Sequence, residues 1–161
     1  NLSSNSSCSS PRRVKMSLGE ARVIEVCCGD QHTLMLSSDG RVRSCGAAGV
    51  AGCGGMTDAW VPTLLWRLAE RGVDIVRIAS AGLHSLAVSS EGDVFSWGFG
   101  DGGSLGHGDD EPRADPTMIR GLCGERVVHV DCGADCSSAY AVAPPRLFWW
   151  GNENTLFGSC R

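Results

Sequence analysis

The sequence has no long apolar run: nothing in its 161 residues approaches the roughly 20 apolar residues that a membrane-spanning helix needs. It also shows no secretory signal, because its first ten residues are Asn and Ser apart from one Leu and one Cys. These absences predict an intracellular protein, cytoplasmic or nuclear, without a membrane span. The chain starts at Asn1 and lacks an initiating Met, so we expect it to be a piece of a longer protein.

The sequence also has no excess of basic over acidic residues. The formal net charge is −4 and the sequence pI is about 5.5. A surface that neutralises DNA phosphates is basic, so this balance argues against direct DNA binding by the bulk of the chain. The basic cluster Arg12, Arg13 and Lys15 falls in residues 1–21, which are predicted to form a Ser-rich, flexible tail.

Proline is scarce, with six residues, whereas glycine is abundant, with 22. The glycines follow no G-X-Y period, so they indicate many tight turns rather than a collagen-like chain. Apolar residues make up 42% and charged residues 20%, as in ordinary globular proteins. This composition favours a β-rich domain with a hydrophobic core.

One segment of the chain repeats with a period of 52 residues. When His32 is placed over His84, apolar residues and glycines coincide over the flanking sequence. Matched pairs include Ile24 with Val76, Val26 with Ile78, Leu34 with Leu86, Leu36 with Val88, Gly40 with Gly92, and Gly46 with Gly98. A further step reaches Val128, Val130, Cys132, Gly133 and Tyr140, with Cys136 in place of histidine. The third copy ends incomplete at Arg161.

Each copy divides into short alternating runs that predict about four β-strands. Asp39-Gly40 is typical of a two-residue hairpin turn. The segment 67–72 is expected to form no more than a turn of helix. Four-stranded units at this period are typical of propeller blades, which need neighbours to bury their apolar faces. We therefore predict an all-β fold: a partial β-propeller of about three four-stranded antiparallel blades.

The motifs resemble repeats of the regulator of chromosome condensation family. CCGDQHTLML from Cys27 and SWGFGDGGSLGHG from Ser96 carry that family's Cys-Gly-x-x-His-Thr-like stretch, Trp-Gly pair and glycine-rich loop. The resemblance implies a seven-bladed propeller, here with just under three repeats: about 22–73, 74–125 and an incomplete 126–161. Even four blades would need about 208 residues at this period. We therefore expect missing sequence or another chain to complete the ring.

Several patterns that suggest chemistry are better explained by the repeat. Residues 98–103 fit G-x-G-x-x-G, but no helix is predicted to follow, so a nucleotide site is not favoured. Nine cysteines include Cys27-Cys28 and Cys132-x-x-x-Cys136, but no Cys-x-x-Cys pair. Cys28, Ser80 and Cys132 occupy one repeat position, where a small buried residue is expected. We predict reduced thiols, with no metal and no cofactor.

Histidines and tryptophans are the other side chains that could carry function. His32 and His84 share one repeat position, so we expect them to bond backbone groups within their own blades rather than act as general bases. His107 is expected in a loop and His129 in a strand. One of Trp149 and Trp150 should occupy the position of Trp97, and the other could face outward. Trp60 and Trp66 are predicted to lie in the core.

These residues form no catalytic constellation, so the chain is predicted to be no enzyme, with no catalytic, cofactor-binding or metal-binding residues. The leading hypothesis is a protein-interaction scaffold built from propeller repeats, part of a larger protein. The resemblance implies a broad range, which includes exchange factors, HECT-class ubiquitin ligases and a plant ultraviolet-light receptor. One alternative is guanine-nucleotide exchange on the small GTPase Ran with chromatin association. Another is a structural subunit of a large assembly.

Overall fold

Antiparallel strands paired in sequence order form three sheets. The computed structural model describes residues 10–11, 13–14, 16–54 and 57–152. Blade 1 contains β1 (Val23–Cys28), β2 (His32–Ser37), β3 (Val42–Gly46) and β4 (Ala59–Leu64). Blade 2 contains β5 (Ile75–Ala81), β6 (His84–Ser89), β7 (Val94–Gly98) and β8 (Arg113–Met118). Blade 3 contains β9 (Val127–Cys132), β10 (Cys136–Val142) and β11 (Pro145–Gly151).

The two complete blades confirm the predicted four-stranded antiparallel unit, and the described part of blade 3 holds three strands in the same order. Equivalent residues pair identically: His32 faces Gly46 across β2 and β3, His84 faces Gly98, and Cys136 faces Gly151. Arg12 and Lys15 of the predicted basic cluster lie outside the described residues.

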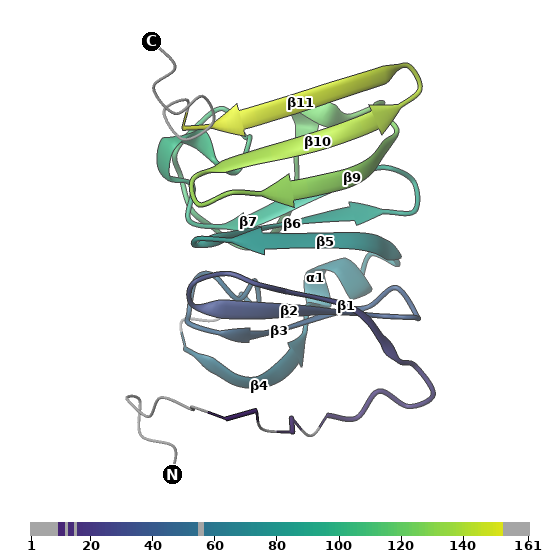
Figure 1. Ribbon diagram of the computed structural model, residues 1–161, viewed down its shortest axis with the longest axis vertical. Coiled ribbons are helices and arrows are strands. Elements are labelled where there is room, and N and C mark those ends of the chain that lie inside the picture. Colours follow the sequence, from purple (N-terminus) through teal and green to yellow (C-terminus); the bar gives the residue numbers. More distant parts are fainter. Residues whose placement is uncertain (1–9, 12, 15, 55–56, 153–161) are drawn as a thin grey trace.

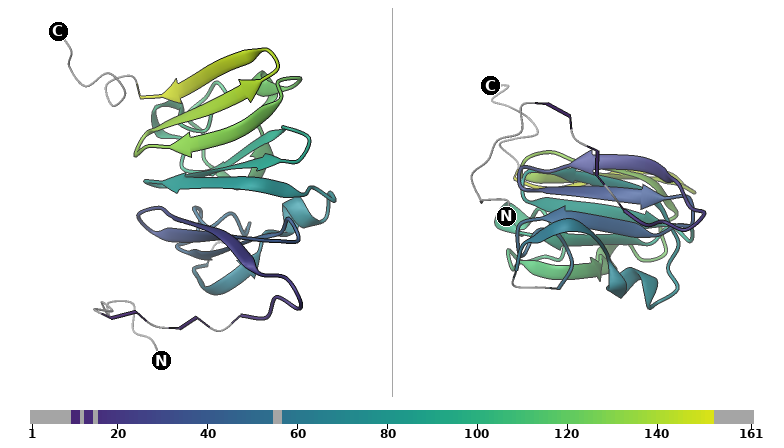
Figure 2. Two further views of the ribbon diagram at one scale, coloured as in Figure 1. Left: turned by 45° about the vertical axis from the view of Figure 1, so that its right-hand side comes forward. Right: turned by 90° about the horizontal axis from the view of Figure 1, so that it is seen from below.

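The blades stack side by side along the molecule, as the ribbon views show (Figures 1 and 2). The first strand of each blade contacts the first strand of the next, so β5 touches both β1 and β9. Each meeting of two blades encloses its own core cluster. All six residues of β6 are buried, because blade 2 is covered on both faces. The propeller packing that the sequence predicts is therefore present.

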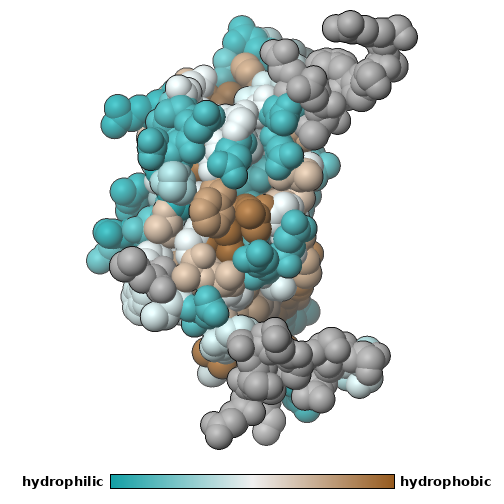
Figure 3. All heavy atoms as spheres, turned by 90° about the vertical axis from the view of Figure 1, so that its left-hand side faces the viewer, coloured by the Kyte–Doolittle hydropathy of each residue, from teal (hydrophilic) through white to brown (hydrophobic). Residues whose placement is uncertain are grey.

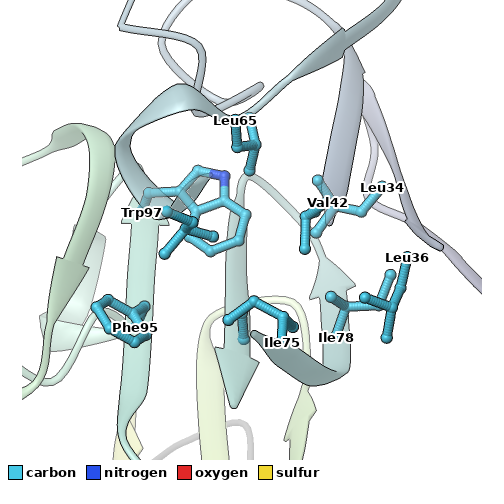
Figure 4. Packing of buried hydrophobic residues seen from close by; sticks show 10 residues of the cluster. Leu34, Leu36, Val42, Leu65, Ile75, Ile78, Phe95 and Trp97 are labelled. Carbon is cyan, nitrogen blue, oxygen red and sulfur yellow. The ribbon is translucent and has the colours of Figure 1, made fainter. Parts of the chain in front are cut away.

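Strand alternation explains the core between blades 1 and 2. Leu34 and Leu36 leave β2 on the side of blade 2, where they share one core cluster with Ile78 and Phe95. Figure 4 shows the indole of Trp97 next to Leu65, which follows β4 in blade 1. Trp97 is fully buried, with an exposed fraction of 0%. Burial of such a side chain supplies a large share of the contact energy of the interface between the blades.

The β2–β3 turn is one residue longer than predicted. The N–H of Ser37 donates to the carbonyl of Arg41 at 2.9 Å, which leaves residues 38–40 as the loop. Gly40 has φ +74°, a left-handed conformation that suits glycine at the last position of a three-residue hairpin loop. Gly92 repeats this arrangement in blade 2 with φ +94°.

Helical structure in the described ranges is limited to short turns: α1 (Trp66–Ala69), η1 (Asp101–Gly103) and η2 (Arg120–Leu122). The first of these confirms the helical turn expected near residues 67–72. The glycine motif at 98–103 enters only a 3₁₀ turn, so it lacks the helix that a dinucleotide site needs. No helix in the described ranges has the length and apolar character to cross a membrane.

The core prediction for Trp60 and Trp66 is wrong. Trp60 lies on β4, the outermost strand of blade 1, and is 68% exposed. Trp66 opens α1 on the outer rim and is 67% exposed. The interior position is taken instead by Leu65, between them and 1% exposed. Outer strands and the turns that follow them contact only one neighbour, so apolar residues there are not forced inward.

Candidate interaction surface and the contacts that support it

Loops gather at one end of the strands and form what we call the long-loop face: residues 29–31, 47–54, 57–58, 82–83, 99–112 and 133–135. They share this end because β1 and β3 run in one direction, and the same holds for their equivalents in blade 2. Figure 3 looks onto this face and shows apolar residues in its middle with hydrophilic residues around them. Faces built from such loops are where propellers carry recognition.

The long-loop face is strongly acidic. Its loops contain no Lys or Arg, and their carboxylates are Asp30, Asp58, Asp101, Asp109, Asp110, Glu111 and Asp135. The loops and short helical turns at the opposite end mix both signs. They carry Arg41, Arg67, Arg71, Arg120 and Arg126 beside Asp39, Glu70, Asp74, Glu91, Asp93 and Glu125. The net negative charge of the chain is thus concentrated on one face.

A cleft of about 130 Å³ opens on this face where loops of all three blades meet. Asp30, Asp101 and Asp135 come from blades 1, 2 and 3 respectively and line it. Phe99, directly after β7, also lines the cleft and is 41% exposed. His84 lines it as well and is 1% exposed. The cleft therefore combines three carboxylates with a half-exposed aromatic ring.

Buried histidines hold the blades together beneath this face. The Nε2 of His32 lies 2.7 Å from the Ser85 Oγ and 2.8 Å from the Ser80 Oγ, both in blade 2. One blade further on, the Nε2 of His84 lies 2.8 Å from the Ser137 Oγ. The prediction that these histidines bond backbone within their own blades is wrong: each reaches a serine of the next blade.

The hydrogen bonds at Ser137 assign the tautomer of His84. The Ser137 hydroxyl donates to the carbonyl of Ser104 at 2.9 Å, which uses its single proton. The Nε2 of His84 must therefore carry a proton and donate to Ser137. Burial lowers the pKa of His84, against a smaller opposing effect of Asp135. Burial likewise lowers the pKa of His32 to about 4, and His84 adds to this lowering. Both rings are neutral near pH 7 and act as structural hydrogen-bond partners.

Removal of the Ser137 hydroxyl tests this contact. Ser137→Ala leaves the Nε2–H of His84 buried without its acceptor, so the free energy of unfolding should fall by about 1–3 kcal/mol. Urea denaturation measures the loss. Ser138→Ala, at the adjacent residue on the opposite side of β10, should change stability far less. Equal losses in the two variants would contradict the inter-blade role of Ser137.

The position shared by Cys28, Ser80 and Cys132 belongs to the same contact. Ser80 is half-buried and its hydroxyl is hydrogen-bonded to the His32 ring. Cys132 is half-buried against blade 2. Cys28 is exposed, so the prediction of a small buried residue is wrong for blade 1. Within the described ranges no blade packs on the side of blade 1 where Cys28 lies.

The remaining histidine and tryptophan predictions are confirmed. His107 lies in the 99–112 loop, with its Nε2 2.9 Å from the Ser96 Oγ, and His129 lies within β9. Trp150 occupies the place of Trp97, since Ser137 pairs with Trp150 as Ser85 pairs with Trp97. Its Nε1 donates to the Ser104 carbonyl at 2.8 Å. Trp149 is 38% exposed.

The seven cysteines that the structure describes carry free thiols: Cys27, Cys28, Cys45, Cys53, Cys123, Cys132 and Cys136. Burial raises the pKa of Cys27 to about 12 and also raises the pKa of Cys132, which keeps both protonated and unreactive near pH 7. Across the described part of the chain, no three His, Cys, Asp or Glu side chains come close enough to hold a metal ion.

Four-stranded antiparallel blades that repeat along the chain and pack through their faces define a β-propeller. A family model described as the Regulator of chromosome condensation (RCC1) repeat matches residues 2–36 and 91–140, and a second of the same description matches residues 23–53. The chain therefore belongs to the regulator of chromosome condensation repeat family. The match begins at residue 2, and the predicted boundary at residue 22 stays a prediction.

Known proteins resemble the chain in sequence and fold. Mouse E3 ubiquitin-protein ligase HERC2 is 36% identical over 141 residues, which is 85% of this chain and 3% of HERC2. The Arabidopsis thaliana ultraviolet-B receptor UVR8 is 35% identical over 70% of this chain and 26% of the receptor. The crystal structure of human WBSCR16 superposes with a TM-score of 0.77 at 30% identity, covering 88% of this chain and 36% of WBSCR16. The chain thus spans a small part of each relative.

Proposed function

We propose that the chain is a protein-interaction scaffold, a set of propeller blades within a longer protein that binds partners through the long-loop face. The observation that carries this proposal is the contrast between the strands of the blades and the loops that connect them. The strands and buried histidines repeat and pack, whereas the 47–58 and 99–112 loops differ in sequence above them. Loops that vary on a rigid scaffold are suited to recognition. The role requires no covalent chemistry.

Both ends of the stack support completion by further blades. Val26 in blade 1 is 56% exposed, whereas Ile78 at the equivalent position of blade 2 is 4% exposed. At the other end, Leu147 in blade 3 is 73% exposed, whereas its equivalent Val94 is 1% exposed. We propose that additional blades, from the parent protein or from another chain, cover these two faces. Such apolar sheet faces would otherwise favour association.

Site-specific photo-crosslinking in the parent protein tests the scaffold role. A photoreactive amino acid at Phe99 should give discrete crosslinked protein adducts in cells, because Phe99 stands half-exposed on the long-loop face. The same amino acid at Glu91, at the opposite end of blade 2, is the matched control. Adducts absent from Phe99 and from every other long-loop position would refute the proposal. The free thiols support a location inside the cell. The location of the protein can be determined in the same cells.

A second candidate is guanine-nucleotide exchange on a small GTPase. The yeast RCC1 protein Prp20, in its complex with Kap60, superposes on this chain with a TM-score of 0.65 at 25% identity, over 80% of this chain and 32% of Prp20. Prp20p is described as binding Gsp1p and histones. Release of labelled GDP from Ran, measured with the complete parent protein, tests this function. Release at the uncatalysed rate would remove the candidate.

A further inference from the structure

The cleft on the long-loop face is built from residues that the repeat does not require. Phe99 is equivalent to Ala47 in blade 1, and Asp101 is equivalent to Gly49. Asp30 has Gly82 and Ala134 at its equivalent positions. The propeller fold therefore needs neither an aromatic ring nor a carboxylate at these places. Their convergence on one cleft calls for an explanation other than packing.

Backbone hydrogen bonds between and within the blades hold the cleft in shape. The N–H of Asp30 in blade 1 donates to the carbonyl of Gly82 in blade 2 at 2.8 Å. The carbonyl of Asp135 accepts from the N–H of Asn152 at 2.9 Å. Gly82 lies so close to Ala134 that a Cβ would collide with the Ala134 carbonyl oxygen. The loops that carry Asp30 and Asp135 are therefore held in place, so little ordering of these loops is needed when a ligand binds.

The chemistry of the cleft selects a cation with an apolar stem. An aromatic ring attracts a guanidinium or ammonium group through its π-face, and nearby carboxylates add charge-assisted hydrogen bonds. No Lys or Arg lines the cleft itself, and the Arg113 guanidinium, just after the 99–112 loop, is paired with Asp109 at 2.8 Å. Asp110 and Glu111 extend the negative charge along the 99–112 loop, beyond the cleft itself. An extended ligand with several positive charges therefore fits better than a single small cation.

We propose that this cleft binds an arginine- or lysine-rich segment of a partner protein, with one basic side chain seated against Phe99 among Asp30, Asp101 and Asp135. The inference rests on the proposed scaffold role and names the chemical class of the partner. Charge complementarity carries the assignment, since the acidic face would repel nucleic acid and acidic peptides.

Fluorescence anisotropy with the full 161-residue chain tests the proposal. The probe is a labelled peptide of alternating arginine and glycine, and the matched peptide has citrulline, which is neutral, at every arginine position. We expect saturable binding of the arginine peptide and at least about tenfold weaker binding of the citrulline peptide. Binding should weaken as salt rises, because screening shortens the reach of exposed charges to about 8 Å at 0.15 M.

Variants locate the binding site. Combined Asp30→Asn, Asp101→Asn and Asp135→Asn should weaken binding about tenfold or more, as should Phe99→Ala. Phe99→Trp should preserve or strengthen it, because tryptophan gives the strongest cation–π contact. The control combines Asp39→Asn, Glu91→Gln and Asp93→Asn, which remove equal charge at the opposite end and should leave affinity unchanged.

Three results would overturn the inference. They are the absence of saturable binding, an equal loss in the control variant, or displacement of the peptide by spermine at a matched charge concentration. The last would show a general polycation surface rather than a site for a protein segment. If the arginine peptide does not bind but Phe99 gives crosslinked adducts in cells, only the proposal of a basic partner segment is rejected. If neither peptide binding nor crosslinked adducts at the long-loop face are found, the scaffold role itself is rejected.

Discussion

Trp97→Ala is expected to lower the free energy of unfolding by about 3–5 kcal/mol. The indole is fully buried between blades 1 and 2, in the cluster that includes Leu65 and Phe95. Its removal leaves a cavity that neighbouring strands cannot close without loss of other contacts. Chemical denaturation followed by tryptophan fluorescence and circular dichroism measures the change. A loss of this size is a large part of the total free energy of unfolding of a domain of this length.

Trp66→Ala provides the matched control, because the same residue type is 67% exposed on the rim of blade 1. We expect it to change stability by less than about 1 kcal/mol. Trp97→Phe should cost less than Trp97→Ala, since phenylalanine keeps most apolar contacts. It also removes the buried Nε1–H, which finds no hydrogen-bond partner among the described residues. Similar losses for Trp97→Ala and Trp66→Ala would contradict the inter-blade core.

Acid should destabilise the chain through His32. The pKa of His32 is lowered from 6.5 to about 4 in the folded state, chiefly by burial and then by His84. Below pH 6.5 the unfolded chain binds a proton that the folded chain excludes, so stability falls with pH from about 6.5 down to about 4 and then levels. The full loss is about 3 kcal/mol, at about 1.4 kcal/mol for each pH unit of difference in pKa.

Comparison with His32→Gln isolates this contribution from the carboxylates that titrate in the same range. Glutamine keeps a hydrogen-bonding group near Ser80 and Ser85 but does not titrate. The free energy of unfolding, measured by urea at several pH values, should fall more steeply between pH 6.5 and 4 for the original chain than for the variant. If the free energy of unfolding depends on pH in the same way for both proteins, the pKa of His32 is not lowered. That result would contradict the buried contact of His32 with blade 2.

The repeat made most of the fold predictable. Apolar alternation around Leu34 and Leu86 located the strands, and the shared spacing of Gly46 and Gly98 marked equivalent positions in the first two copies. These features depend on each strand's own pattern, which the sequence contains directly. The need for stacked neighbours followed from apolar residues on both faces of one thin sheet.

The contacts between blades were harder to predict. The repeat places His32 and His84 in equivalent environments but does not say which neighbour each reaches, so their bonds to Ser85 and Ser137 were assigned wrongly to the backbone. One signal was available: a serine recurs 53 residues after each histidine. Trp60 was misplaced because the outer strand packs on one side only. The cleft around Phe99 was missed because its aromatic and acidic side chains lie at non-equivalent positions of the three copies.

Hydrogen–deuterium exchange of backbone amides tests the stacked-blade structure most directly. All residues of β6 are buried in blade 2, between blades 1 and 3, as are those of its neighbour β7, whereas β1 and β11 lie on the two outward blades and are largely exposed. We predict the slowest exchange in β6 and faster exchange in β1 and β11. Exchange in β6 as fast as in β11 would show that the blades do not pack on both faces of blade 2.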